Sequence, residues 1–296
     1  MITFKNVTKT FNGKNAIKNI SFNIQQGKAT AIIGPNGSGK TTIINLILGF
    51  LKADSGDVLF QEESAWGNRT NVNRQIGVVQ ENPSFYPSMS AEQNLKFFAQ
   101  LFEVSEDNIP RVLKATGMDK HPDKRFSQYS MGMKQRLNIS YSMLHDPEIY
   151  IFDEPTNGLD PVGIADIREI IQKFVQDGKT VILCSHLLAE VEKICQEVII
   201  VKNGLLIEDT DITKDITKKY DFELKYDNME KLISAIKSIP EITLKKNTGD
   251  QCLVQINKKY DGSFINEKLA QKKIYVSEII LIDNFESTIL EKMGEN

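Results

Sequence analysis

The chain has 296 residues, 41% of them hydrophobic, which is long enough for a large core or for two domains. Its 36 basic and 39 acidic residues leave a net charge of −3, so the charge gives no support for nucleic acid as a partner, although a local basic patch stays compatible with it. The longest apolar stretch, 43–51, is interrupted by Asn45 and Gly49 and is too short to span a bilayer, which needs about 20 apolar residues.

Two features indicate the compartment. The first residues lack the basic and apolar pattern of a signal peptide. The cysteines, Cys184, Cys195 and Cys252, are few and lack CxxC spacing, so neither a disulfide framework nor a zinc site is expected. We therefore expect a cytoplasmic protein whose role at a membrane, if any, comes through a partner.

The opening of the chain predicts strands joined by tight turns. Residues 4–11 read as a strand, the sequence NGKN at 12–15 as a turn, and ISFNI at 20–24 alternates apolar and polar side chains. An apolar strand follows at 29–33, and a helical pattern runs over 42–51.

The segment between this strand and this helix matches the phosphate-binding loop (P-loop) GxxxxGK[ST], and it reads Gly34-Pro35-Asn36-Gly37-Ser38-Gly39-Lys40-Thr41. The glycines let successive main-chain amides point inward at phosphate oxygens, and the helix start adds its positive end. Lys40 would reach the β- and γ-phosphates, Thr41 would offer its hydroxyl to Mg²⁺, and Thr42 follows within the same nucleotide-binding set. A glycine-rich turn that matches by chance is the alternative, and the flanking strand and helix argue against it.

The middle of the chain predicts first strands and then helices. A turn and a strand occupy 54–64, a polar, Asn-rich loop surrounds Trp66, and a strand ends at Gln80. Helices are expected over 90–102, 111–118 and 129–144, the first of them starting at Ser90 with acidic residues in its first turn.

An acid pair ends the next apolar strand, IYIFDE at 149–154. Carboxylates at the end of a buried strand are costly unless a cation or a reaction uses them. Beside a P-loop, Asp153 would hold the Mg²⁺ shell and Glu154 would polarise the attacking water. The alternative is a turn with solvated acids.

After this strand, helices and strands alternate to residue 204, which favours a parallel sheet covered by helices.

The pattern changes near Asp209, where a polar, charged linker spans 209–220. The residues beyond it read strand, helix, strand, strand, helix, strand, the order of a small ferredoxin-like domain, and a last helix is expected over 286–293. The predicted domains are therefore 1–210 and 211–296.

Taken together, residues 1–204 resemble the ATP-binding cassette (ABC) family, which implies an α/β P-loop NTPase fold with a mixed sheet, a β-subdomain and a helical subdomain. The resemblance places further functions on this sequence. Phe11 would stack on adenine, unless it is a core side chain. Gln80 would sense Mg²⁺ and the attacking water. His186 would contact the γ-phosphate, unless it is structural, and Asp160 belongs to a loop that crosses the dimer interface.

The segment YSMGMKQR at 129–136 resembles the family signature LSGGQxQR. It departs from the signature at Tyr129, Met131 and Met133, and it keeps Ser130 and Gly132, which the family uses on the γ-phosphate of an ATP held by another subunit. Residues 82–87 would line the contact with a permease, the alternative being a loop whose aromatic side chains pack against its own domain.

The resemblance implies an ATPase that binds ATP and Mg²⁺ as a homodimer and powers a separate integral membrane permease. The protein would lie on the inner face of the membrane through that permease. The signature and the C-terminal extension resemble the bacitracin and lantibiotic-resistance exporters, which implies export of a peptide antibiotic or a similar compound. The extension would be a regulatory or dimer-supporting module.

Two alternatives are a cytosolic cassette ATPase of translation or DNA repair and a regulator without turnover. A single P-loop and the short stretch from Gln80 to Ser130 argue against the first, and the presence of Lys40 and Glu154 argues against the second.

Overall fold

The computed structural model describes residues 1–81, 84–211, 219–257, 260–282 and 289. The chain forms two compact units, Met1–Thr210 and Asp211–Asn296. Asn82 and Pro83 of the predicted permease contact, the centre of the predicted linker, and nearly all of the predicted last helix lie outside the described residues.

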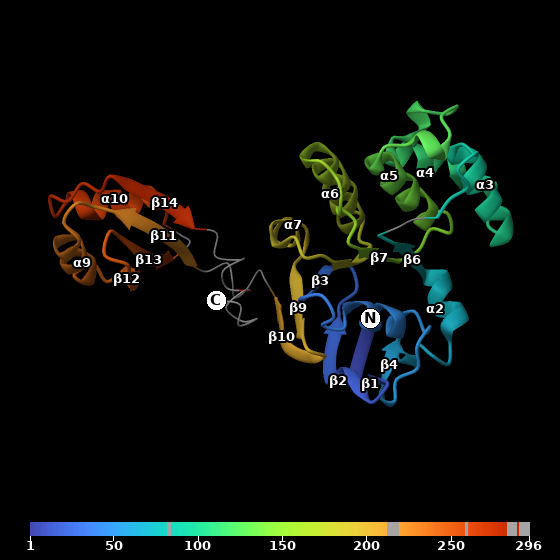
Figure 1. Ribbon diagram of the computed structural model, residues 1–296, viewed down its shortest axis with the longest axis horizontal. Coiled ribbons are helices and arrows are strands. Elements are labelled where there is room, and N and C mark those ends of the chain that lie inside the picture. Colours follow the sequence, from blue (N-terminus) through green and yellow to red (C-terminus); the bar gives the residue numbers. More distant parts are fainter. Residues whose placement is uncertain (82–83, 212–218, 258–259, 283–288, 290–296) are drawn as a thin grey trace. The chain divides into compact units, whose positions relative to one another are not determined.

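The first unit contains two sheets (Figure 1). The smaller, antiparallel sheet has the order β2-β1-β4-β5, with β1 Ile2–Phe11, β2 Lys14–Ile24, β4 Ser55–Phe60 and β5 Glu63–Ser64. The larger sheet has the order β10-β9-β3-β8-β7-β6, with β3 Ala29–Ile33, β6 Ile76–Val79, β7 Ile149–Asp153, β8 Thr180–Cys184, β9 Glu197–Lys202 and β10 Leu205–Asp211. The neighbours from β9 to β6 pair in parallel, as the alternating sequence pattern predicted.

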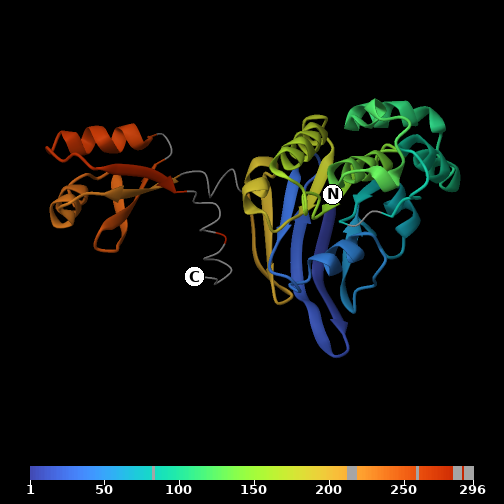
Figure 2. The ribbon, with the colours of Figure 1, turned by 45° about the horizontal axis from the view of Figure 1, so that its top comes forward.

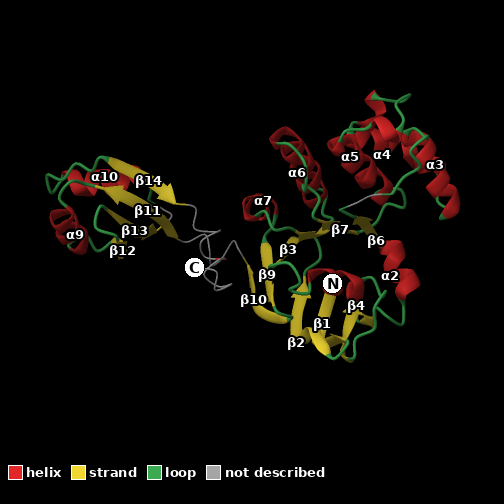
Figure 3. Cartoon of the chain, viewed as in Figure 1, coloured by secondary structure: helices red, strands yellow, loops and turns green. Residues whose placement is uncertain are grey.

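Seven α-helices of this unit are described, and Figure 3 separates them from the strands. They are α1 Lys40–Ile47, α2 Arg69–Gln75, α3 Ala91–Leu101, α4 Ile109–Thr116, α5 Met131–Ser142, α6 Pro161–Gln176 and α7 Leu188–Ile194. Three short 3₁₀ helices lie among them, η1 Glu106–Asn108, η2 Met118–Lys120 and η3 Phe126–Gln128.

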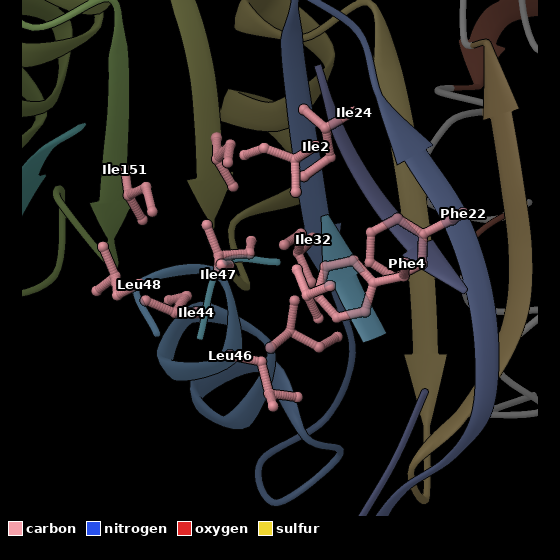
Figure 4. Packing of buried hydrophobic residues seen from close by; sticks show 14 of the residues in the cluster. Ile2, Phe4, Phe22, Ile24, Ile32, Ile44, Leu46, Ile47, Leu48 and Ile151 are labelled. Carbon is pink, nitrogen blue, oxygen red and sulfur yellow. The ribbon is translucent and has the colours of Figure 1, made fainter. Parts of the chain in front are cut away.

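A continuous hydrophobic core lies between the two sheets, and α1 contributes to it from its buried side (Figure 4). Phe4 and Phe22 face each other across β1 and β2 with their rings stacked at 4.3 Å between centroids. Ile44 and Ile47 of α1 meet Ile32 of β3 in the same core. Because both ends of the P-loop are packed into this core, the loop is held on a rigid base.

A helical subdomain is formed by α3, α4 and α5, which lie together at one side of the unit (Figure 2). The predicted start at Ser90 is confirmed: its side chain accepts from the amide of Gln93 at 3.3 Å, and the Gln93 side chain accepts from the Ser90 amide at 2.9 Å. Phe85 packs into an aromatic cluster of this subdomain with Phe98 and Phe126, whereas Tyr86 stays exposed.

Two elements differ from the sequence prediction. The expected polar loop after Trp66 contains the helix α2, whose only buried side chain among the described residues is that of Val72, so no apolar repeat announced it. The predicted linker begins inside a strand, β10, which adds to the edge of the large sheet beside β9. The exposed leucine and isoleucine side chains of β10 do not follow the alternation of buried and exposed positions that marks an inner strand.

The described residues 219–257 and 260–282 of the second unit form one antiparallel sheet and two helices, in the predicted order of strands and helices. Its elements are β11 Lys219–Lys225, α9 Met229–Lys237, β12 Ile242–Asn247, β13 Gln251–Asn257, α10 Gly262–Ala270 and β14 Glu278–Ile282, and the strand order is β12-β13-β11-β14. Leu232 of α9, Leu269 of α10 and Val254 of β13 share one core. Assignment to the ferredoxin-like fold stays a prediction.

Candidate nucleotide-binding site

The P-loop connects β3 to α1 through positions that only glycine fits. A Cβ on Gly34 would lie 2.0 Å from the carbonyl oxygen of Val201, and one on Gly39 would lie 2.6 Å from Cδ1 of Ile17. Gly39 also has φ +115°, a conformation that L side chains rarely adopt. The loop is therefore pressed against β9 and β2, with its open side left to a ligand.

The open side of the loop is rich in donors. Lys40 Nζ donates to the carbonyl oxygens of Gly34 at 2.6 Å and Pro35 at 3.3 Å, so its cation lies inside the curl of the loop. The first turn of α1, all of it described, has no acidic residue and no side-chain cap. Ser38 Oγ is buried without a hydrogen-bond partner among the described residues. Uncapped amides, a lysine and a spare hydroxyl fit the phosphates of a nucleotide.

The acid pair lies at the carboxyl end of β7, beside β8. Asp153 is in register with Cys184, and the amide of Glu154 donates to the Cys184 carbonyl oxygen at 2.9 Å. Burial raises the pKa of the Asp153 carboxyl, the charges of Glu154 and Glu81 raise it further, and Lys40 opposes them. More negative than positive charge therefore surrounds the Asp153 carboxylate.

Glu154 is held by the predicted histidine. His186 Nδ1 lies 2.8 Å from Oε2 of Glu154, and the His186 amide donates to the same oxygen at 3.4 Å. Glu154 itself has φ +48°, which is uncommon for a residue with a side chain. The Glu154 side chain is 16% exposed, so His186 holds a carboxylate that keeps some access to solvent.

Two further predicted residues lie at strand ends. Gln80 follows β6 and has an exposed side chain, while its carbonyl oxygen accepts from Asn138 Nδ2 at 2.7 Å. Phe11 ends β1 and is 45% exposed, with Lys9 Nζ 5.5 Å from its ring centroid. The alternative of a core phenylalanine is therefore wrong, and stacking on adenine stays a prediction.

The signature residues line a different cavity, of about 470 Å³. Ser130 caps α5, because its Oγ accepts from the Met133 amide at 3.4 Å, and Asp160 caps α6 by accepting from the Gly163 amide at 2.7 Å. Both line the cavity together with Gly132. Apart from the chain neighbours of Gly132 and the backbone of its own helix, no heavy atom of the described residues comes within 4 Å of a Cβ built there, so the helix start is open.

The predicted residues thus fall into two groups. Lys40, Asp153, Glu154 and His186 meet at the carboxyl ends of parallel strands, where ligands of open α/β sheets bind. The P-loop residues, all of them described, do not line the cavity that holds Ser130, Gly132 and Asp160. The chain therefore carries two separate groups of predicted nucleotide-binding residues.

Sequence reasoning missed two side-chain contacts in this region. Asn157 Nδ2 donates to Glu81 Oε1 at 2.7 Å, joining the turn after Glu154 to the residue after Gln80. Asn138 fixes Gln80 from the signature helix. No sequence motif predicts either contact, because each joins residues more than 50 positions apart.

The donor set fits a magnesium ion that is shared with a nucleotide. Among the described residues, no three His, Cys, Asp or Glu side chains gather as a self-sufficient metal site. Asp153 and the exposed hydroxyl of Thr41 offer oxygen ligands, and Mg²⁺ binds through one or two such groups together with phosphates.

Comparison with known proteins decides the family. The sequence profile described as ABC transporter matches residues 17–157. The lantibiotic transport ATP-binding protein SrtF of Streptococcus pyogenes is 36% identical over 234 residues, which are 79% of this chain and 96% of SrtF. The chain belongs to the ATP-binding proteins of ABC transporters. It is accordingly an ATPase that binds ATP through a P-loop cassette.

Other members of the family extend the comparison. An ABC transporter ATP-binding protein of Bacillus subtilis, YhcH, is 33% identical over 100% of this chain and 96% of its own length. The bacitracin transport ATP-binding protein BcrA of Bacillus licheniformis is 35% identical over 77% of this chain and 76% of BcrA.

Solved ABC cassettes share the fold of the first unit. CbiO1 of Clostridium perfringens, part of the transporter complex CbiONQ, has a TM-score of 0.67 and 29% identity, covering 73% of this chain and 90% of CbiO1. The bacterial cassette MJ0796, solved as a dimer, has a TM-score of 0.64 and 26% identity, covering 72% of this chain and 99% of MJ0796. Cassettes of this family thus act as dimers and within transporter complexes. In this ABC protein, no helix among the described residues has the length and apolar character to cross a membrane.

Proposed function

We propose that two copies of this ABC ATP-binding protein close head to tail around two ATP molecules and thereby drive a separate membrane permease. The observation that carries the proposal is the separation of the two half-sites, the P-loop with Glu154 and His186 in one and the 470 Å³ cavity of Ser130 and Gly132 in the other. A triphosphate bound to one half leaves negative charge unsatisfied, so the open helix start of a second copy supplies what is lacking.

The P-loop half would grip the nucleotide. The amides of the loop and Lys40 hold the β- and γ-phosphates, and exposed Phe11 stacks on adenine. Thr41, Asp153 and Gln80 would hold Mg²⁺, which neutralises phosphate charge when it is bound. More negative than positive charge surrounds Asp153, and a bound cation would offset it, which supports this role.

Hydrolysis would take place at Glu154. Its carboxylate accepts a hydrogen bond from a water whose oxygen attacks the γ-phosphorus, while the bond from that phosphorus to the β–γ bridging oxygen breaks. ADP, inorganic phosphate and a proton are released. His186 holds Oε2 of Glu154 and offers its ring to the departing phosphate. Loss of the γ-phosphate removes the contacts to Ser130 and Gly132, and the two copies separate.

The variant Glu154→Gln tests this proposal, because it keeps the shape of the side chain and removes its charge. We expect ATPase turnover to fall at least about 100-fold, the range typical of a lost general base. We also expect ATP to shift the variant to a dimer in gel filtration. Full turnover in this variant, or a monomer with ATP bound in the presence of the permease, would contradict the proposal.

An exposed apolar surface supports a protein partner for the helical subdomain. Phe97 and Leu101 of α3 and Phe102, which follows this helix, are exposed, and the Tyr86 ring lies 4.8 Å from that of Phe97. Grouped aromatic side chains on a surface mark contacts with other proteins. We propose that the permease binds here, and that it holds this protein at the inner face of the membrane.

The names of SrtF and BcrA support a peptide antibiotic as the exported compound. Cells that express this protein with its neighbouring permease should tolerate a higher concentration of bacitracin or of a lantibiotic. The same cells with Glu154→Gln are the control. Equal sensitivity of both strains to every such peptide would exclude this substrate class, while an intact ATPase would leave the cassette function standing.

The second unit is proposed to regulate or support the dimer. It has its own core, and the match to YhcH covers 100% of this chain and so includes this unit.

A further inference from the structure

The first two residues after β6 are held by two asparagine side chains that come from different elements. In the described part of the large sheet, β6 is the edge strand and pairs only with β7. The path of Gln80 and Glu81 is therefore not set by a further strand, and side chains have to fix it.

The first fastening comes from the signature helix. Asn138 of α5 is 3% exposed, and its Nδ2 donates to the Gln80 carbonyl oxygen at 2.7 Å. Without this acceptor, the buried amide of Asn138 would have neither water nor a protein partner, which costs free energy. The contact is therefore strongly favoured. It ties the main chain of Gln80 to the same helix that Ser130 caps.

The second fastening comes from the turn after the acid pair. Asn157 Nδ2 donates to Oε1 of Glu81 at 2.7 Å, a bond between an amide and a charged acceptor. The main-chain amide of Asn157 donates in turn to the carbonyl oxygen of Glu154 at 3.2 Å. One residue thus links Glu81 to Glu154.

We infer that Asn157 and Asn138 are positioning residues for ATP hydrolysis, which hold Gln80 and Glu81 in register with Glu154 and the signature helix. The inference deepens the proposed function and rests on it. Movement of the segment after Gln80 would pull on both asparagines, so the permease contact and the hydrolytic carboxylate are mechanically joined through them. The charge of Glu81 is also felt at Asp153, which places the link beside the metal-binding acid.

The hydrogen bond can be tested by reversing it. Asn157→Asp sets two carboxylates against each other and should lower kcat about tenfold, because a charge-assisted bond is lost and a repulsion is added. The KM for ATP should stay within about twofold, since the P-loop grip is untouched. Adding Glu81→Gln restores a donor and an acceptor with reversed roles and unchanged net charge, so the double variant should regain most of the turnover.

A matched control exists elsewhere in the same unit. Asn68 donates to Glu63 in an exposed Asn–Glu pair, and Asn68→Asp should leave kcat unchanged. Hydrogen exchange gives a second measurement: amides in a peptide covering 76–81 should exchange faster in Asn157→Asp and in Asn138→Ala than in the unaltered chain, and slow again in the Asn157→Asp, Glu81→Gln double variant.

Unchanged kcat and unchanged exchange in Asn157→Asp would overturn the inference, as would a loss of turnover that the double variant does not restore. Failure of the proposed function looks different, because the unaltered chain would then lack ATPase activity or Glu154→Gln would fail to form an ATP-dependent dimer.

Discussion

At the scale of single residues, two glycines of the nucleotide site are needed for different reasons. Gly34 has no room for a side chain because the Val201 carbonyl is too close, whereas Gly132 faces open space. The fold requires the first glycine, whereas we propose that the bound phosphate requires the second.

Alanine at each position separates the two reasons. Gly34→Ala should destabilise the first unit by about 2–3 kcal/mol and weaken ATP binding, since the main chain has to move. Gly132→Ala should leave the melting temperature unchanged and lower ATPase turnover about tenfold or more, because the methyl group displaces the partner's phosphate. Thermal melts and steady-state ATPase measurements check both, and a large loss of stability in Gly132→Ala would contradict the open helix start.

The carboxyl of Asp153 predicts a dependence of stability on pH. Its pKa is raised in the folded chain, so folding favours the neutral form, and stability is lost as pH rises upward from the ordinary value of 3.8 through the folded value. Asp153→Asn stays neutral at every pH.

This variant should therefore melt at a higher temperature than the unaltered chain at pH 7 without nucleotide, and the gain should shrink as pH falls toward 3.8. Its ATPase activity should be lost. Thermal melts across this pH range provide the measurement, and exposed Asp123, changed to Asn, should show no such gain. An equal gain at low and neutral pH would mean that the buried charge of Asp153 is not what destabilises the chain.

At the scale of elements, the parts that carry a repeating apolar pattern could be predicted from sequence. The apolar runs of β3, β7 and β8, and Ser90 with an acidic first turn behind it, predicted their elements. The helix α2, with one buried side chain, and the edge strand β10 had no such pattern. The P-loop and the acid pair were found because their chemistry depends on neighbours in sequence. The bonds of Asn138 and Asn157 were not, because they depend on how distant segments pack.

The start of α5 allows capping to be separated from phosphate binding. Aspartate caps helices about as well as serine, so Ser130→Asp should change stability by no more than about 0.5 kcal/mol. In the proposed dimer, the added negative charge would face the partner's triphosphate. In the Glu154→Gln background, Ser130→Asp should abolish the ATP-dependent dimer in gel filtration, whereas Ser90→Asp, which caps α3, should not. A dimer that persists in Ser130→Asp would argue against contact between this helix start and ATP.

At the scale of the whole molecule, the two units have separate cores. The core between the sheets of the first unit contains no residue of the second unit among those described, and the reverse also holds. Damage to one core should therefore stay within its unit.

Leu269→Ala provides the test, because this fully buried side chain of α10 belongs to the second core. We expect a loss of about 2–5 kcal/mol in the stability of the second unit. Calorimetry should show one transition shifted downward and the other unmoved, and ATP binding at the P-loop should be retained. A single transition that shifts as a whole would mean that the units unfold together.

The separate positions of Lys40 and Ser130 have a genetic consequence in the dimer that we propose. A chain defective at Lys40 and a chain defective at Ser130 would each be inactive alone, because every composite site in either homodimer carries the lesion. A dimer with one chain of each kind would have one composite site with both lesions and one intact site. Two null alleles would then complement each other when expressed together, and two alleles altered in the same half would not.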